Sequence, residues 1–251
     1  MSPAAPTAGF AVVALIYGSV GFGGGSSYTA LLTLSDLPPT WIPALSLTCN
    51  ILVVAGSSAH FARRGHLSWP LAWPFLLTSI PCAYLGGRWP IRLEIFLALL
   101  GASLVLAGAA LLVQRASNET SSRGVPPCAL GLALGAALGL LSGLVGIGGG
   151  IFLSPILLHR RWGTPKQIAT TAALFILANS IAGLAGQLGK LSTFDPLVGR
   201  WPLFLAVVAG GQIGSLLGSG PFPQRLVRAL TAVLVMAAGL RVLWRLGALG
   251  S

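Results

Sequence analysis

The sequence predicts an all-α integral membrane protein made of two homologous halves, each with one glycine-interrupted helix, re-entrant or broken, and three transmembrane helices. Three observations support this fold class. Hydrophobic residues make up 55% of the 251 residues and charged residues only 8%, whereas soluble domains have about 25% charged residues. The hydrophobic residues gather in runs of about 20, which can cross a ~30 Å hydrocarbon layer as helices. A glycine-rich motif also occurs once in each half.

Eight apolar segments follow one another with short connections between them. In chain order they cover residues 8–34, 41–62, 68–87, 93–114, 126–158, 165–188, 197–219 and 223–246. The first and the fifth contain the two glycine motifs, and the other six have the length of one spanning helix. Almost nothing lies outside these segments. The sequence therefore predicts a multi-pass membrane protein without a soluble catalytic domain.

The two glycine motifs predict interruptions in the first and fifth segments. Residues 20–25 read VGFGGG and residues 145–150 read VGIGGG. Consecutive glycines readily adopt positive φ, and unpaired backbone groups cost several kcal/mol each in hydrocarbon, so such a break survives only inside protein or beside a polar cavity. We expect one helix to end near Val20 and the next to start near Ser26, with the corresponding start at Ile151.

The likeness between the halves extends beyond these motifs. ARRGHLSW at 62–69 parallels GQLGKLST at 186–193, and the last helices of the two halves also align. The predicted organisation is a first transmembrane repeat over residues 1–114, a polar linker over 115–125 and a second repeat over 126–251. Paired glycine-interrupted segments are typical of repeat-built transporters whose site lies near the bilayer midplane.

The distribution of Lys and Arg favours re-entrant hairpins over crossing segments. If both interrupted segments turn back, one side of the membrane carries nine cationic residues and the other six. If both cross, the counts are seven and eight. Because cytoplasmic loops are enriched in Lys and Arg, the larger bias predicts six full crossings, both termini outside and two halves inverted relative to each other.

The start of each half-helix after a glycine break is a candidate anion site, because its free N–H groups and positive dipole end attract negative charge. Two such starts could converge on one solute. Hydroxyl donors follow the first break, and further polar residues, among them Ser46, interrupt apolar runs. The candidate substrate-binding residues are Gly23, Gly24, Gly25, Ser26, Ser27, Tyr28, Thr48, Asn50, Gly148, Gly149, Gly150, Ile151, Thr170, Thr171 and Asn179.

Other classes of function fit the sequence poorly. The four acidic residues, Asp36, Glu94, Glu119 and Asp195, fall in connections or at helix ends, so no carboxylate at membrane depth could relay protons or hold sodium. Acid–base or metal catalysis would need a His, Asp or Glu constellation at that depth, so we expect no enzyme. The three cysteines show neither CxxC nor CxxH spacing, and we expect no metal, cofactor or disulfide.

The net charge of +11 could suggest binding to nucleic acid. The cationic residues, however, sit in short connections and at helix ends, where they contact anionic lipid head groups and fix the topology. The expected partners are therefore the lipid bilayer and a small anionic substrate, not nucleic acid.

The motifs together resemble the sulfite exporter TauE/SafE family, also called the 4-toluene sulfonate uptake permeases. The resemblance rests on the doubled GxGGG, on TPKQIATTAALFILANSIAGLAGQLGKLS at 164–192 and on AYLGGRW at 83–89, and it covers nearly the whole chain. It implies a bacterial inner-membrane carrier of sulfite, sulfonates or related small organic anions. The matching positions are Gly21, Gly23 to Gly25, Gly146, Gly148 to Gly150, Thr170, Thr171 and Asn179. ALSLTCN at 44–50 departs from the Gly/Ala-Thr-Ser run usual in the family.

Two alternatives stay open at this point. The chain could carry reduced sulfur such as thiosulfate or sulfide, with Cys49 and Cys82 as polarizable contacts. It could also be a non-transporting partner subunit. The substrate, the direction of transport, the coupling ion and the oligomeric state are not determined by the sequence, and a homodimer is one of the assemblies it allows.

Overall fold

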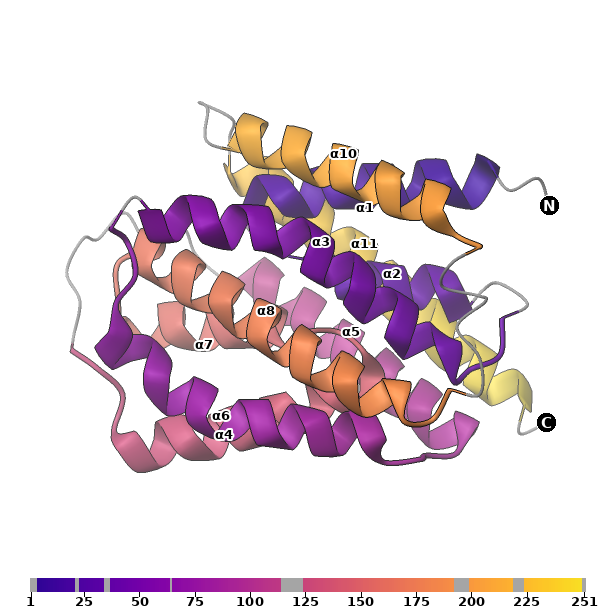
Figure 1. Ribbon diagram of the computed structural model, residues 1–251, viewed down its shortest axis with the longest axis horizontal. Coiled ribbons are helices and arrows are strands. Elements are labelled where there is room, and N and C mark those ends of the chain that lie inside the picture. Colours follow the sequence, from indigo (N-terminus) through magenta and orange to yellow (C-terminus); the bar gives the residue numbers. More distant parts are fainter. Residues whose placement is uncertain are drawn as a thin grey trace.

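The computed structural model describes residues 4–20, 23–33, 37–63, 65–113, 124–191, 199–218 and 224–249. These residues form helices and connections and contain no strand, which confirms the all-α class (Figure 1). The helices are α1 (Ala4–Val20), α2 (Gly25–Thr33), α3 (Trp41–Arg63), α4 (Trp69–Arg88), α5 (Leu93–Val113), α6 (Cys128–Val145), α7 (Gly150–Arg160), α8 (Pro165–Leu188), α10 (Trp201–Gly218) and α11 (Gln224–Leu249).

Several helices have the length and composition of membrane spans. Among the described residues, Leu93–Leu112, Cys128–Val145 and Pro165–Leu188 are long and apolar enough to cross a membrane, and three shorter apolar helical stretches accompany them. Large apolar side chains also lie on the outside: Trp244 is 77% exposed, and Leu106 67%. Such extensive apolar exposure is costly in water and is expected of surfaces that face lipid.

Glycines let the long helices pack closely in pairs. α6 lies along α4, and α10 lies along α1. An added Cβ at Gly139 would lie 2.6 Å from Ser79 Cα, and one at Gly214 would lie 2.9 Å from Leu15 Cα. Small residues at such contacts allow backbones to approach each other and are typical of helix association in membranes. The packing of α4 with α6, and of α1 with α10, joins elements far apart in the chain.

α1 and α2 run antiparallel and form a helical hairpin. Gly9 near the start of α1 lies beside Leu31 near the end of α2, with 3.9 Å from its ideal Cβ to Leu31 Cδ1. The rings of Phe10 and Tyr28 stack at 5.0 Å. At the other end of the hairpin, Tyr17 in α1 reaches the start of α2. α2 therefore runs back along α1.

α6 and α7 are separated by a short glycine-rich turn. Gly146 caps α6 with φ of 81° and donates its N–H to Ser142 O at 2.8 Å. Gly148 and Gly149 also have positive φ, 83° and 77°, a region that costs other residues about 1–2 kcal/mol. α7 then begins at Gly150. The glycines are needed here because three positive φ values fall within four residues.

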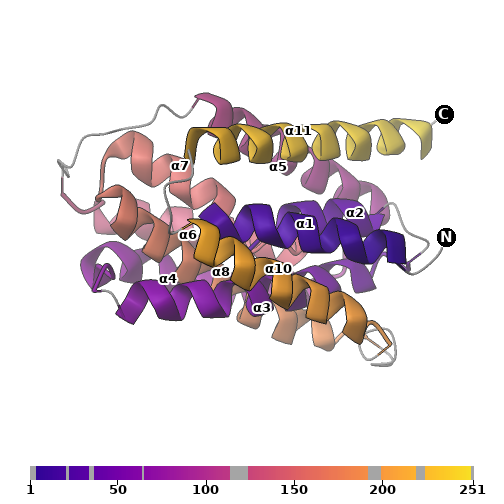
Figure 2. The ribbon, with the colours of Figure 1, turned by 90° about the horizontal axis from the view of Figure 1, so that it is seen from above.

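The two short helices extend toward opposite ends of the molecule. Figures 1 and 2 place α2 toward the end that holds both termini, and α7 toward the other end. α3 and α8 pack against each other in the interior and carry buried polar side chains among apolar ones. α8 starts with a capping box, in which Thr164 Oγ1 accepts from Gln167 N and Thr164 N donates to Gln167 Oε1.

Candidate functional site

The two glycine-rich segments, residues 23–25 and 146–150, meet in the centre of the molecule; we call them together the glycine crossing. A Cβ at Gly25 would lie 2.8 Å from Ile147 O. Asn50 of α3 fits between the segments: a Cβ on Gly23 would collide with its Oδ1, and one on Gly148 would lie 2.8 Å from its Nδ2. Side chains at these glycines would separate the two segments or displace Asn50.

α3 supplies two polar side chains to the glycine crossing. Ser46 and Asn50 are four residues apart and so share one face of the helix. Ser46 Oγ lies 2.9 Å from Gly25 O and 2.9 Å from Gly146 O. Asn50 Nδ2 donates to Ile147 O at 3.2 Å. α3 thus satisfies backbone carbonyls that the helix ends leave without a helical partner.

The starts of α2 and α7 carry backbone donors without helical partners. In α2 the first intrahelical bond runs from Tyr28 N to Gly24 O at 3.0 Å. The N–H groups of the three helical residues before Tyr28 therefore have no carbonyl partner within the helix. In α7 the first intrahelical bond runs from Phe152 N to Gly149 O at 3.1 Å, and no side chain caps this helix. Both helix starts are buried. Each start lies one residue earlier than the sequence predicted.

The hydroxyl groups that follow the first break face α1. Tyr17 OH lies 3.2 Å from Ser26 Oγ and 2.9 Å from Ser27 Oγ. Tyr28 OH is buried and has no hydrogen-bond partner among the described residues. Tyr17 is not among the predicted site residues, although the polar group of a tyrosine inside an apolar run requires a partner.

α8 contributes buried polar groups that lack partners. Asn179 is fully buried, and neither its Nδ2 nor its Oδ1 has a partner among the described residues; the same holds for Thr171 Oγ1 and Ser180 Oγ. A Cβ on Gly148 would lie 3.2 Å from Ser180 Oγ, so this hydroxyl borders the glycine crossing. Buried polar groups are normally hydrogen-bonded, and exceptions often indicate a role in ligand binding or function.

Two predicted residues turn away from the glycine crossing. Thr48 Oγ1 donates to Ala44 O at 2.9 Å, and Thr170 Oγ1 donates to Lys166 O at 2.8 Å. Both bonds stay within the residue's own helix, the common arrangement for a threonine inside a helix. Their hydroxyl hydrogens are therefore occupied, and Thr48 does not meet the two glycine-rich segments as Asn50 does.

Thr29 joins the glycine crossing although the sequence did not single it out. Its Oγ1 lies 2.8 Å from Gly25 O, 2.8 Å from Ser46 Oγ and 3.4 Å from Gly146 O. It stands four residues after Gly25, a spacing at which a threonine commonly bonds back to the helix carbonyl. The contact between Thr29 and Gly146 joins the two halves of the chain, and no local sequence pattern predicts it.

Comparison with known proteins identifies the group to which this architecture belongs. The model of the family described as sulfite exporter TauE/SafE matches residues 7–242. The chain belongs to the TauE/SafE family. It is also 35% identical over 240 residues to "Probable membrane transporter protein y4hK" of Sinorhizobium fredii (strain NBRC 101917 / NGR234), covering 94% of this chain and 96% of that protein. No solved structure matches.

Membership of the TauE/SafE family confirms the resemblance found in the sequence and makes the protein a membrane transporter rather than an enzyme. Among the described residues of this transporter, no group of three or more His, Cys, Asp and Glu could hold a metal ion. Cys49 is buried on α3, Cys82 is half-buried on α4, and Cys128 is exposed at the start of α6.

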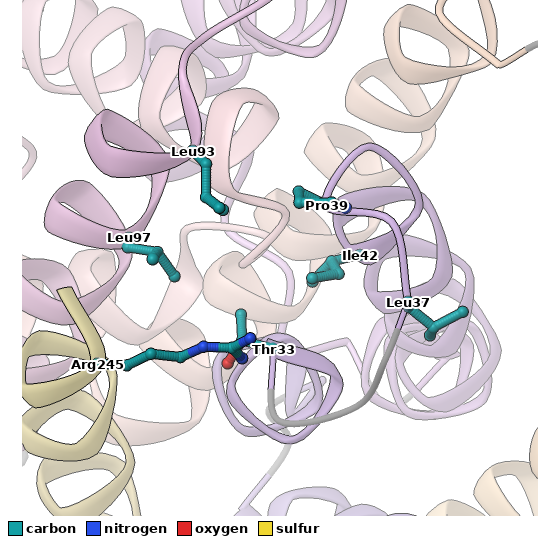
Figure 3. A pocket seen from close by; sticks show the side chains of 7 residues that line it. All are labelled: Thr33, Leu37, Pro39, Ile42, Leu93, Leu97 and Arg245. Carbon is teal, nitrogen blue, oxygen red and sulfur yellow. The ribbon is translucent and has the colours of Figure 1, made fainter. Parts of the chain in front are cut away.

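A small pocket of the transporter lies away from the glycine crossing. It measures about 40 Å³ and is formed where the end of α2 meets the beginnings of α3 and α5 (Figure 3). Arg245 extends into it from α11. The other lining residues are Thr33, Leu37, Pro39, Ile42, Leu93 and Leu97. Because Thr33 ends α2, the pocket lies at the opposite end of that helix from the crossing.

Proposed function

We propose that this transporter carries small anions, in the first place sulfite, organosulfonates or related sulfur-containing organic anions, and that they bind at the glycine crossing near the bilayer midplane. One observation carries the proposal: two buried helix starts, whose first N–H groups have no helical partner among the described residues, lie at the glycine crossing. The description of the family as sulfite exporters supports the substrate class. The setting would be the bacterial inner membrane.

The electrostatics of the glycine crossing favour an anion. A helix start acts as roughly half a positive charge, and its N–H groups can donate directly to an oxyanion. α2 and α7 extend in opposite directions from the crossing (Figures 1 and 2), so their positive ends face each other. The one acidic residue among the described residues is Glu94, which is exposed at the start of α5. No described carboxylate opposes an anion at the crossing.

The packing of the helices supports a repeat-built transporter with inverted halves over residues 1–114 and 126–251, joined by the linker 115–125. α1 packs on α10 as α6 packs on α4, so that the first helix of each half contacts the fourth described helix of the other, and α5 and α11 pack on each other. The antiparallel α1 and α2 suit a re-entrant hairpin. Two such hairpins entering from opposite faces would meet at the midplane, where alternating access exposes a site to either side.

The direct test is anion binding and flux with the purified protein as the sole component of liposomes. We expect saturable binding and uptake of sulfite or of a sulfonate such as sulfoacetate, with taurine, thiosulfate and simple carboxylates compared in the same panel. Neutral and cationic solutes serve as controls. Uptake of reduced sulfur alone would instead favour the cysteine-based alternative. No flux of any anion would contradict the proposal and leave the partner-subunit alternative.

Replacing Asn179 with leucine is expected to stabilise the protein while it lowers transport. The buried amide has no hydrogen-bond partner among the described residues, and an unsatisfied buried polar group costs about 1–3 kcal/mol. An apolar side chain of similar size should therefore raise the free energy of unfolding by about 1 kcal/mol. If Asn179 contacts the substrate, uptake should fall at least tenfold.

The matched control for Asn179→Leu is Thr170→Val on the same helix, because the Thr170 hydroxyl is bonded to Lys166 O. This variant should transport at close to the wild-type rate. Thermal unfolding and uptake are measured side by side for both variants. Unchanged uptake in Asn179→Leu would remove Asn179 from the site.

A further inference from the structure

The small pocket at the end of α2 has a buried floor and an exposed rim, and we call it the Arg245 pocket (Figure 3). Three lining residues are at most 3% exposed and form the floor: Thr33, Ile42 and Leu97. Three others are exposed and form the rim: Pro39, Leu93 and Arg245. The pocket is therefore open at the surface of the protein and closed toward its interior.

Arg245 gives this pocket a positive charge. Its guanidinium extends from α11 into the pocket, toward Thr33 (Figure 3). Within the described parts of the chain, Arg245 forms neither an ion pair nor a hydrogen bond. Glu94, the acidic residue next to Leu93, is exposed and does not pair with it, and Asp36 lies outside the described residues. The five N–H donors of the guanidinium therefore have no described partner.

The rest of the lining suits an apolar body rather than a second polar group. Five of the seven lining residues are apolar: Leu37, Pro39, Ile42, Leu93 and Leu97. The Thr33 hydroxyl donates to Ala30 O at 2.7 Å, so it has no hydrogen left for a ligand. A matching ligand has one anionic group for Arg245 and little other polar surface. Sulfite and short alkyl sulfonates have this form.

We propose that the Arg245 pocket is a second anion site of the transporter, which captures a terminal sulfite or sulfonate group. A water molecule needs about 10–15 Å³, so a pocket of about 40 Å³ takes roughly three waters or one –SO₃ group. A guanidinium can bind two oxygens of such a group side by side. The phosphate of a phospholipid is bonded to carbon groups on two sides and cannot enter end-on, so the occupant is a soluble anion.

The place of the pocket makes it a capture site on the route to the glycine crossing, and this part rests on the proposed function. α2 has nine residues, so at 1.5 Å per residue about 13 Å separate its two ends. The end with the pocket points toward both termini (Figures 1 and 2), the side predicted to face outside. An anion on that side meets Arg245 first. A positive charge at an entrance raises the local anion concentration, which lowers the KM and leaves the maximum rate to the crossing.

The first test measures sulfite flux in liposomes over a range of concentrations. Arg245→Gln should raise the KM at least fivefold and keep the maximum rate within twofold of the wild type. Leu93→Trp, which obstructs the rim without a change of charge, should do the same. Arg241→Gln is the matched control, because Arg241 is exposed one turn earlier on α11 and does not line the pocket. An unchanged KM in Arg245→Gln would overturn the capture site.

The second test counts bound anions by equilibrium dialysis of the protein in a maltoside detergent, with ³⁵S-labelled methanesulfonate as the probe. We expect two anions on the wild type and one on Arg245→Gln. One anion on both proteins would refute the pocket and leave the proposed function intact. One on the wild type and none on Arg245→Gln would support the pocket and contradict binding at the glycine crossing.

Phosphorus analysis of the same samples distinguishes a soluble anion from a lipid. We expect equal phosphorus per protein in the wild type and in Arg245→Gln. If Arg245→Gln instead loses one phosphorus per protein and keeps every methanesulfonate that the wild type binds, the pocket holds a phospholipid head group and the capture site is wrong.

Discussion

Gly148→Ala is expected to lower transport at least a hundredfold. Gly148 has φ of 83°, which costs an alanine about 1–2 kcal/mol. Its new Cβ would lie 2.8 Å from Asn50 Nδ2 and 2.9 Å from Ile176 Cγ2, and overpacking of this kind costs a further ~1–3 kcal/mol. Relief of the clash requires Asn50 or the turn itself to move, which displaces the N–H groups at the start of α7. Uptake in liposomes and thermal unfolding report the two effects.

Gly65→Ala separates the backbone cost from the contact. Gly65 has φ of 72°, and a Cβ there would meet no atom within 4 Å. This control should lose about 1 kcal/mol of stability through the backbone alone and keep its transport rate. If Gly148→Ala and Gly65→Ala lose the same stability and both transport normally, the crowding of Gly148 by Asn50 is not present in the protein.

The positions of the helices could be predicted from the sequence because their causes are local. The segments 41–62, 93–114 and 165–188 coincide with α3, α5 and α8 to within one residue at each end. Hydrophobic length and the cap formed by Thr164 and Gln167 act within one helix. The end of α1 at Val20 likewise agrees with the prediction, because consecutive glycines interrupt a helix wherever they fall.

The contacts at the glycine crossing could not be predicted in this way. α3 contains Ser46, Thr48 and Asn50, and its hydrophobic residues are spread around the whole helix. Without a distinct polar face, the sequence does not show which side of α3 points into the protein. Packing decides that Ser46 and Asn50 face the two glycine segments and that Thr48 bonds its own helix. The bond from Ser46 to Gly146 joins residues 100 positions apart, which no local pattern specifies.

Asn50→Ala is expected to reduce transport at least a hundredfold, since Asn50 contacts both glycine segments. The variant loses the donor to Ile147 O and leaves that buried carbonyl unsatisfied, at a cost of about 1–3 kcal/mol. It also removes the spacer that holds Gly23 and Gly148 apart. Thr48→Ala, two residues earlier, is the control and should retain transport, because its hydroxyl bonds only Ala44 O among the described residues.

The double variant Asn50→Ala/Gly148→Ala tests the contact itself. The alanine Cβ at position 148 would lie 2.8 Å from Asn50 Nδ2, so that shortening Asn50 removes this close contact while the one with Ile176 Cγ2 stays in place. The double variant should therefore lose less stability than the sum of the losses in the two single variants, with a coupling of about 1 kcal/mol or more. Independent sites add to within about 0.5 kcal/mol. A cycle that is additive within that limit would mean that Asn50 does not lie against Gly148, and the glycine crossing would lose the residue that joins its two halves.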